Sequence, residues 1–209
     1  MLEDSKKTSR SIFSAISRGS LIEVNEILDR DSSVLNQIGS SKYTPIFHAI
    51  LGKKKEIVDA IINRDPSVLN QESSSGNTPI SLAIQSGNLD IVKAIIKKVP
   101  WVLEQKDSKG DTPIFIAIRS GNLDIVKAIL EEDRSVLSVL KQENSSGDTP
   151  ITLATLISLN SSRRTREDKA SEVFQTILQH QFPGAIDKAG QEDFKELFLQ
   201  ESFLKGLYS

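Results

Sequence analysis

Three segments of the chain repeat one pattern: YTPIFHAILGKKKEIVDAII (43–62), NTPISLAIQSGNLDIVKAII (77–96) and DTPIFIAIRSGNLDIVKAIL (111–130). Each later segment starts 34 residues after the one before it. The segment SIFSAISRGSLIEVNEIL (11–28) fits the same pattern without its Thr-Pro dipeptide, and Thr149-Pro150 begins another copy after a spacing of 37. A period of this length is typical of stacked units, none of which can bury its apolar face alone.

Each repeat is predicted to form two helices joined by a tight turn. Thr78 can accept a hydrogen bond from a free amide of the first helical turn, and Pro79 suits the position after it, where a missing N–H costs nothing. Gly87 supplies the left-handed residue that ends this short helix. A small residue lets neighbouring helices approach closely; it recurs as Ala15, Ala49, Ala83, Ala117 and Ala154. The second helix has the apolar face Leu89, Ile91, Val92, Ile95 and Ile96.

Polar segments separate the repeats. SSSGN (73–77), DSKGD (107–111) and NSSGD (144–148) each contain glycine, so we expect them to form tight turns that protrude as hairpin-like fingers. On the other side of each repeat, Pro66 or Pro100 helps to stop the second helix. The apolar pairs Val68-Leu69 and Val102-Leu103 follow these prolines and are predicted to return to the core.

This pattern resembles the ankyrin repeat, with its G-x-T-P-L start, short helix, glycine, second helix carrying I-V-x-x-L-L, and β-turn. The match covers roughly residues 5–160 and is strongest where SGNLDIVKAI occurs twice unchanged. The resemblance implies an all-α ankyrin-repeat solenoid of about five helix-turn-helix repeats. The histidine that the family carries after T-P-L is absent, and its place is taken by Phe47, Ser81, Phe115 and Thr152.

The expected ankyrin-repeat domain covers residues 1–187 and is followed by a C-terminal tail at 188–209. Its units lie near 5–38, 39–72, 73–106, 107–143 and 144–187. The last unit is degenerate: an insertion at 160–171 replaces the glycine turn, so either the loop has grown or a helix has lengthened. The tail is predicted to be a capping helix, because helical spacing relates its apolar residues Phe194, Leu197, Phe198, Leu204 and Leu207.

Composition and motifs argue against several function classes. The chain has 26 Lys and Arg against 28 Asp and Glu, and a formal net charge of −2 does not favour nucleic-acid binding, which needs clustered cations. It contains no cysteine and only two histidines, which disfavours metal sites. No common nucleotide-binding, hydrolase or metalloprotease motif occurs, and no apolar run is long enough to span a membrane. We therefore expect a non-enzymatic protein with no catalytic residue, no cofactor and no metal.

The two histidines have structural interpretations. His48 takes the place of Leu82 in the repeat pattern and is interpreted as a half-buried structural residue. His180 follows an apolar helical segment and is expected near the C-terminus of that helix, where the helix dipole favours a cation.

The resemblance implies that a protein partner binds on the concave side, against finger tips and the exposed face of each first helix. Carried over position by position, the partner-binding residues are Tyr43, Phe47, Leu51, Asn77, Ser81, Gln85, Asp111, Phe115, Arg119, Asp148 and Leu156. The phenylalanines are either anchors or residues that pack between helices, and we prefer the packing interpretation. Tyr43 and Arg119 are the expected exposed anchors, and Leu51 and Leu156 add apolar contact.

Two further features have open interpretations. Trp101 either covers helix ends or forms a contact on the side opposite the fingers. The basic cluster Arg163, Arg164, Arg166 and Lys169 is interpreted as a solvated loop, with nuclear localisation or an acidic partner as the alternative.

The setting of the protein is inferred from composition and from the tail. Repeats rich in Ile, Lys, Ser and Asn are similar to ankyrin proteins of intracellular bacteria. Glu192, Glu196 and Glu201 precede Leu207, a pattern similar to type IV secretion signals of Legionella and Coxiella. No Sec-type signal peptide is visible, so we expect a monomer that is cytoplasmic or secreted by a non-Sec route to bind a host protein. The alternatives are self-association through the tail and regulation of an enzyme through the fifth repeat.

Overall fold

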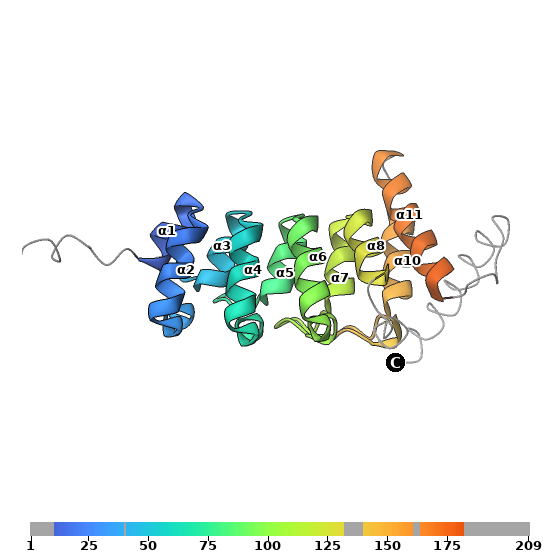
Figure 1. Cartoon of the computed structure of the whole chain (residues 1–209). Helices are drawn as coiled ribbons and strands as arrows, with labels where there is room; N and C mark the ends of the chain where they lie inside the picture. The colour runs from blue at the N-terminus through green and yellow to red at the C-terminus, as the bar shows by residue number, and fades with distance from the viewer. Residues whose placement is uncertain (1–10, 40, 132–139, 161–163, 182–209) are drawn as a thin grey trace, which may run out of the picture. The chain divides into compact units, whose positions relative to one another are not determined.

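The computed structural model describes residues 11–39, 41–131, 140–160 and 164–181 (Figure 1). Every regular element within these residues is a helix, as the repeat pattern predicts. The chain divides into two compact units, residues 1–102 and 103–209. No helix in the described part of the chain combines the length and apolar character that crossing a bilayer requires.

The first unit contains three helix pairs. They are α1 (Ile12–Arg18) with α2 (Leu21–Arg30), α3 (Pro45–Leu51) with α4 (Lys55–Arg64), and α5 (Pro79–Gln85) with α6 (Leu89–Lys98). The first helices α1, α3 and α5 pack side by side in sequence order, and the second helices α2, α4 and α6 do the same (Figure 1). Short 3-10 helices follow the second helices: η2 (Ser32–Asn36), η3 (Pro66–Asn70) and η4 (Pro100–Glu104).

In its described residues, the second unit contains two further helix pairs, α7 (Pro113–Ser120) with α8 (Leu123–Glu131) and α10 (Pro150–Asn160) with α11 (Arg164–Gln181). α7 packs against α10, and α8 packs against α11, so this unit repeats the arrangement of the first. The fifth repeat has longer helices than the others, with 11 residues in α10 and 18 in α11. Residues 164–171 of the insertion belong to α11, while 161–163 lie outside the described residues.

The core lies between the helices and uses the residues that the repeat pattern indicates. The five repeated alanines are 0–1% exposed, so each lies where neighbouring helices meet. Ile91, Val92, Ile95 and Ile96 of α6 are buried, and so are the apolar pairs that follow α4 and α6. Thr78 caps α5 as predicted, with its Oγ1 accepting from the amide of Ser81 at 3.2 Å. Gly87 has the predicted left-handed conformation, with φ of 65°.

The structure confirms the expected fold class, while several expectations lie outside the described residues. These are the start of the first unit at 5–10, the basic residue Arg163, and the whole proposed capping tail at 188–209. The remaining members of the basic cluster lie in the first half of α11. The prediction that these residues form a loop is therefore wrong, because the helix begins at Arg164.

Candidate partner-binding surface

The fingers are turns held by their own first side chains. Ser73 Oγ accepts from the amides of Ser75 at 3.3 Å and Asn77 at 3.1 Å. In the second unit, Asp107 and Asn144 do the same with one side-chain oxygen each, accepting from the second and fourth residues after them. A backbone bond from the first residue to the fifth closes each turn. The fingers are therefore preformed, since these bonds engage the first side chain and close the backbone within the turn.

The finger at 39–43 is built differently, because its first residue is a glycine. Gly39 donates its amide to the carbonyl of Tyr43 at 2.9 Å but has no side chain to accept from the turn. A Cβ at Gly39 would lie 2.9 Å from Cε1 of Phe13, so the backbone rests directly on that ring. Lys42 then takes φ of 62°, a left-handed conformation in a residue with a side chain.

The last residue of each finger is followed, eight positions later, by an exposed residue of the next first helix, and in two repeats these two side chains form a pair. In the first unit, Gln85 Nε2 donates to Asn77 Oδ1 at 3.1 Å. In the second unit, Arg119 donates to the carboxylate of Asp111. The same two positions hold Tyr43 with Leu51 and Asp148 with Leu156. The same two positions of the repeat therefore carry an amide pair in one repeat, an ion pair in another and an aliphatic residue in the others.

Three of the sequence-predicted contact residues lie in the core. Phe47 and Phe115 are 0% exposed and Ser81 is 1% exposed. At this position, three residues after the threonine, these side chains do not reach the surface, whereas the equivalent Thr152 is half-buried. The ring of Phe47 lies 5.7 Å from that of Tyr43 and supports it from below. These three residues are removed from the contact set, and their burial agrees with the packing interpretation of the phenylalanines.

The other predicted residues reach the surface, except Asp111, which binds the exposed Arg119. Leu51 and Leu156 are 45% and 38% exposed, and both lie on the exposed side of a first helix. Gln85 and Arg119 are exposed, and Tyr43, Asn77 and Asp148 are half-buried. Asp111 is buried and orients Arg119. The structure thus brings together, in each unit, the finger ends and the first-helix ends that the sequence singled out.

The histidines and the tryptophan lie as follows. His48 is half-buried, and its ring meets Phe13 edge-on at a centroid distance of 5.5 Å, as a structural residue between α1 and α3 would. His180 lies in the last turn of α11 and is exposed, as predicted. Trp101 lies in η4 and is 45% exposed. In the described residues, no group of three His, Cys, Asp or Glu side chains could hold a metal ion.

Charge is distributed unevenly within the first unit. Helices α1, α3 and α5 contain no Asp or Glu, whereas the second helices α2, α4 and α6 contain six. Asp59 of α4 is held by Lys55 at 3.0 Å and by Lys98 at 3.5 Å. The hydrogen bond to Asp59, together with its negative charge, raises the pKa of Lys55 above its ordinary value. Of these acids, Asp29 and Asp59 pair with cations of the second helices, whereas Glu23 pairs with Arg18 at the end of α1.

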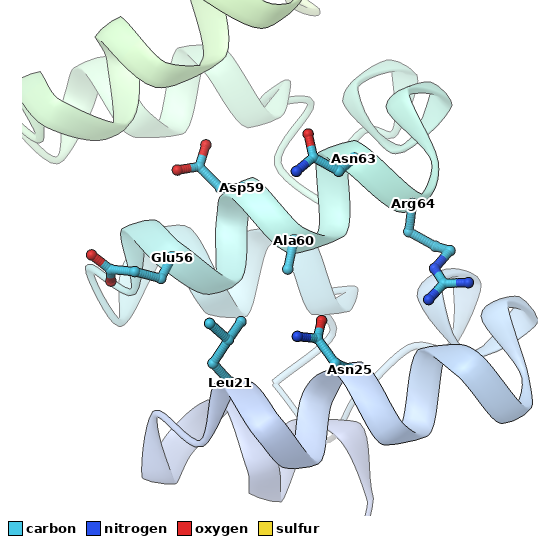
Figure 2. A pocket seen from close by; sticks show the side chains of 7 residues that line it. All are labelled: Leu21, Asn25, Glu56, Asp59, Ala60, Asn63 and Arg64. Atoms are coloured by element: carbon cyan, nitrogen blue, oxygen red, sulfur yellow. The ribbon is translucent and has the colours of Figure 1, made fainter.

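A hollow of about 540 Å³ between α2 and α4 was not indicated by the sequence (Figure 2). Its lining residues are Leu21, Asn25, Glu56, Asp59, Ala60, Asn63 and Arg64. Lys98 of α6 reaches Asn63 and Asp59 of α4, two of the lining residues. Asn25 lies on the α2 side of the hollow, opposite α4 (Figure 2). The hollow lies on the second helices and is not part of the finger surface.

Comparisons with known proteins agree with this geometry. Family models of ankyrin repeats match residues 12–102 and residues 80–130. No curated protein sequence matches the chain. Among the solved structures, the crystal structure of EF0377, an ankyrin repeat protein, has a TM-score of 0.66 and 20% identity. The match covers 86% of this chain and 83% of that one. At this identity the likeness shows the fold alone.

Proposed function

Since the chain belongs to the ankyrin-repeat family over residues 12–130, we propose that it is a non-enzymatic module that binds a partner protein through its fingers and first helices. Ankyrin repeats are generally protein–protein interaction modules. The proposed contact residues lie at finger ends and on the exposed side of the first helices of each unit: Tyr43, Leu51, Asn77 and Gln85 in the first unit, and Arg119, Asp148 and Leu156 in the second.

The observation that carries the proposal is the variable pair eight residues apart on an otherwise constant repeat. The residues that build the fold, such as the buried alanines, hardly change from one repeat to the next. The paired positions change from amides at Asn77 and Gln85 to opposite charges at Asp111 and Arg119. Variation confined to exposed positions of a rigid scaffold is what specific recognition of another surface requires.

The proposal can be tested without disturbing the fold. The double variant Asp111→Asn/Arg119→Gln reproduces in the second unit the amide pair that Asn77 and Gln85 already form in the first. A partner captured on the full chain should bind this variant and Leu51→Ser about tenfold more weakly, since central contact residues each contribute more than about 1 kcal/mol. The matched control is Ile22→Ser, which removes an equally apolar side chain, 75% exposed, from α2. Equal affinities in calorimetry for all variants would reject this surface.

We further propose that the partner is a host protein and that the chain reaches it by type IV secretion. Support comes only from sequence: the Ile-, Lys-, Ser- and Asn-rich repeats and the glutamates that precede Leu207. The test is a translocation assay with a reporter enzyme fused ahead of the chain, with and without residues 188–209. Loss of host-cell reporter activity on removal of the tail, but not on inactivating the finger surface, is the expected result. Delivery that is independent of the tail and of the secretion system would contradict it.

A further inference from the structure

Two lysines of the second repeat occupy positions where the other repeats use glycine. Lys42 has φ of 62°, and the equivalent residues Gly76, Gly110 and Gly147 have φ of 71°, 76° and 76°. Lys53 has φ of 54°, and its equivalents are Gly19, Gly87 and Gly121 with φ of 74°, 65° and 64°. A side chain is strained in this region and glycine is not. At both positions the repeat therefore accepts backbone strain and gains a cationic side chain.

These lysines flank a single helix and are open to solvent. Lys42 precedes α3 and Lys53 follows it, and both side chains are exposed. Neither lysine forms an ion pair with any residue in the described ranges. The neighbouring lysines differ in this respect: Lys54 lies over Gly19, and Lys55 binds Asp59. Lys42 and Lys53 are thus positive charges that are not paired with an acid in the described part of the chain.

An apolar side chain lies between the two charges. Leu51 is the last residue of α3 and is 45% exposed. Helical side chains lean toward the N-terminus of their helix, so Leu51 leans from the Lys53 end toward the Lys42 end. The first helices α1, α3 and α5 contribute no acids to the surface near it. Together these residues form a cation–apolar–cation row along the second repeat.

From this row we infer that the second repeat binds an extended acidic segment of the partner, with carboxylates at i and i+4 and an apolar side chain at i+2. This inference rests on the proposed function and specifies the chemistry of the partner. Side chains at i, i+2 and i+4 of an extended chain point to one face. They span about 13 Å, while α3 is about 10 Å long with a turn at each end. Carboxylates at this spacing can therefore reach the lysines at the two ends of α3, with the central side chain placed toward Leu51.

A peptide fits this surface better than a nucleic acid. Binding to a phosphate backbone needs many clustered cations, and here two cations are separated by an exposed leucine. The chain as a whole has a net charge of −2. An acidic peptide uses both the charges and the apolar contact, whereas a phosphate backbone would leave Leu51 unused.

The test uses the ¹⁵N-labelled full chain and the probe peptide Gly-Ser-Glu-Ser-Leu-Ser-Glu-Ser-Gly, followed by NMR titration, which detects weak binding. Amide shifts should be concentrated around Lys42, Leu51 and Lys53 and should diminish with added salt. A peptide with Gln in place of both Glu, and one in which Glu and Leu are adjacent, should bind at least about threefold more weakly, because each exposed ion pair contributes little on its own.

The decisive variant is Lys42→Gly/Lys53→Gly, which restores the residue that the other repeats use and therefore keeps the fold. It should bind the probe about fivefold more weakly, as expected for the loss of two exposed ion pairs, while its melting temperature rises. The control Lys93→Gln/Lys97→Gln removes two exposed charges from α6 and should bind as the wild type does.

The inference is overturned if the wild type does not bind the probe, if the glycine variant binds it equally well, or if a single-stranded oligonucleotide shifts the same amides at lower concentration. A captured partner that binds the wild type and the glycine variant with equal affinity would leave the proposed function standing and overturn only this inference. A partner that loses affinity for the glycine variant, but not for the α6 control, would support both.

Discussion

The guanidinium of Arg119 binds the carboxylate of Asp111, the last residue of the finger at 107–111. The side chain of Asp111 is 2% exposed, whereas that of Arg119 is 43% exposed. A carboxylate this deeply buried needs a partner, because desolvation of a lone charge is costly. The ion pair therefore joins the finger to the end of α7 while leaving part of Arg119 available to another molecule.

Arg119→Ala should destabilise the second unit even though it removes a half-exposed side chain. The variant leaves Asp111 buried without its cation, at an expected cost of about 1.5–3 kcal/mol in the free energy of unfolding. Urea denaturation followed by circular dichroism would measure this. Asp111→Asn/Arg119→Gln is the matched comparison and should cost less than Arg119→Ala. Equal stability of wild type and Arg119→Ala would show that the pair contributes nothing.

The left-handed lysines should lower stability relative to glycine. Lys42→Gly and Lys53→Gly are each expected to raise the free energy of unfolding by about 1 kcal/mol, the usual cost of a left-handed side-chain residue. The converse change is Gly121→Ala, whose added Cβ would meet nothing within 4 Å. It should therefore cost about 1 kcal/mol from backbone strain alone. Thermal denaturation of the three variants would test both signs, and a destabilised Lys53→Gly would contradict the argument.

Substitutions should separate core from surface among the predicted contact residues. Phe47→Ala and Phe115→Ala remove fully buried rings and should each cost about 3–5 kcal/mol. Leu51→Ala and Leu156→Ala remove exposed side chains and should change stability by less than about 0.5 kcal/mol. Denaturant titrations of the four variants measure the difference. A large loss for Leu51→Ala would mean that this leucine supports the fold rather than binding.

Acid should weaken the cap of η2. Hydrogen bonds from the side chain and backbone of Ser33 hold the pKa of Asp31 below its ordinary value, and the backbone amide lies 2.9 Å from Oδ1. A lowered pKa in the folded state gives stability that is present above the ordinary value, about 3.9, and is lost as pH falls through the folded value. NMR titration of the Asp31 carboxyl should give the lowered pKa. Asp31→Asn should reduce the loss of stability below about pH 4, and an unchanged acid profile would refute this.

The sequence predicted the fold because each element has a local signature that recurs. Thr78, Pro79 and Gly87 mark the ends of a short helix, and the spacing of Ile91, Val92, Ile95 and Ile96 marks the buried face of the next. The paired positions, such as Asn77 and Gln85, could also be found, since they vary within a constant pattern. The hydrogen bonds between them could not be predicted, because side-chain pairing depends on how a finger folds back toward its helix.

Other features needed three-dimensional information. The burial of Phe47 depends on how neighbouring elements pack around it, which periodicity does not give. The hollow between α2 and α4 depends on how the side chains of two helices meet, which the repeat spacing does not show. The left-handed lysines could have been predicted, since the 34-residue spacing aligns Lys42 with Gly76 and Lys53 with Gly87. Only the structure shows that the backbone keeps its left-handed conformation at these positions although the residue is lysine.

The first helices have a thermodynamic consequence of their own. α1, α3 and α5 have seven residues each, well below the about 12–15 residues at which an isolated helix becomes even marginally stable in water. Each contact face therefore exists only while adjacent repeats hold it in place. A partner that spans two repeats binds only the folded repeats. Its binding therefore raises the free energy of unfolding of these repeats. Recognition and folding in this protein are thus a single coupled equilibrium.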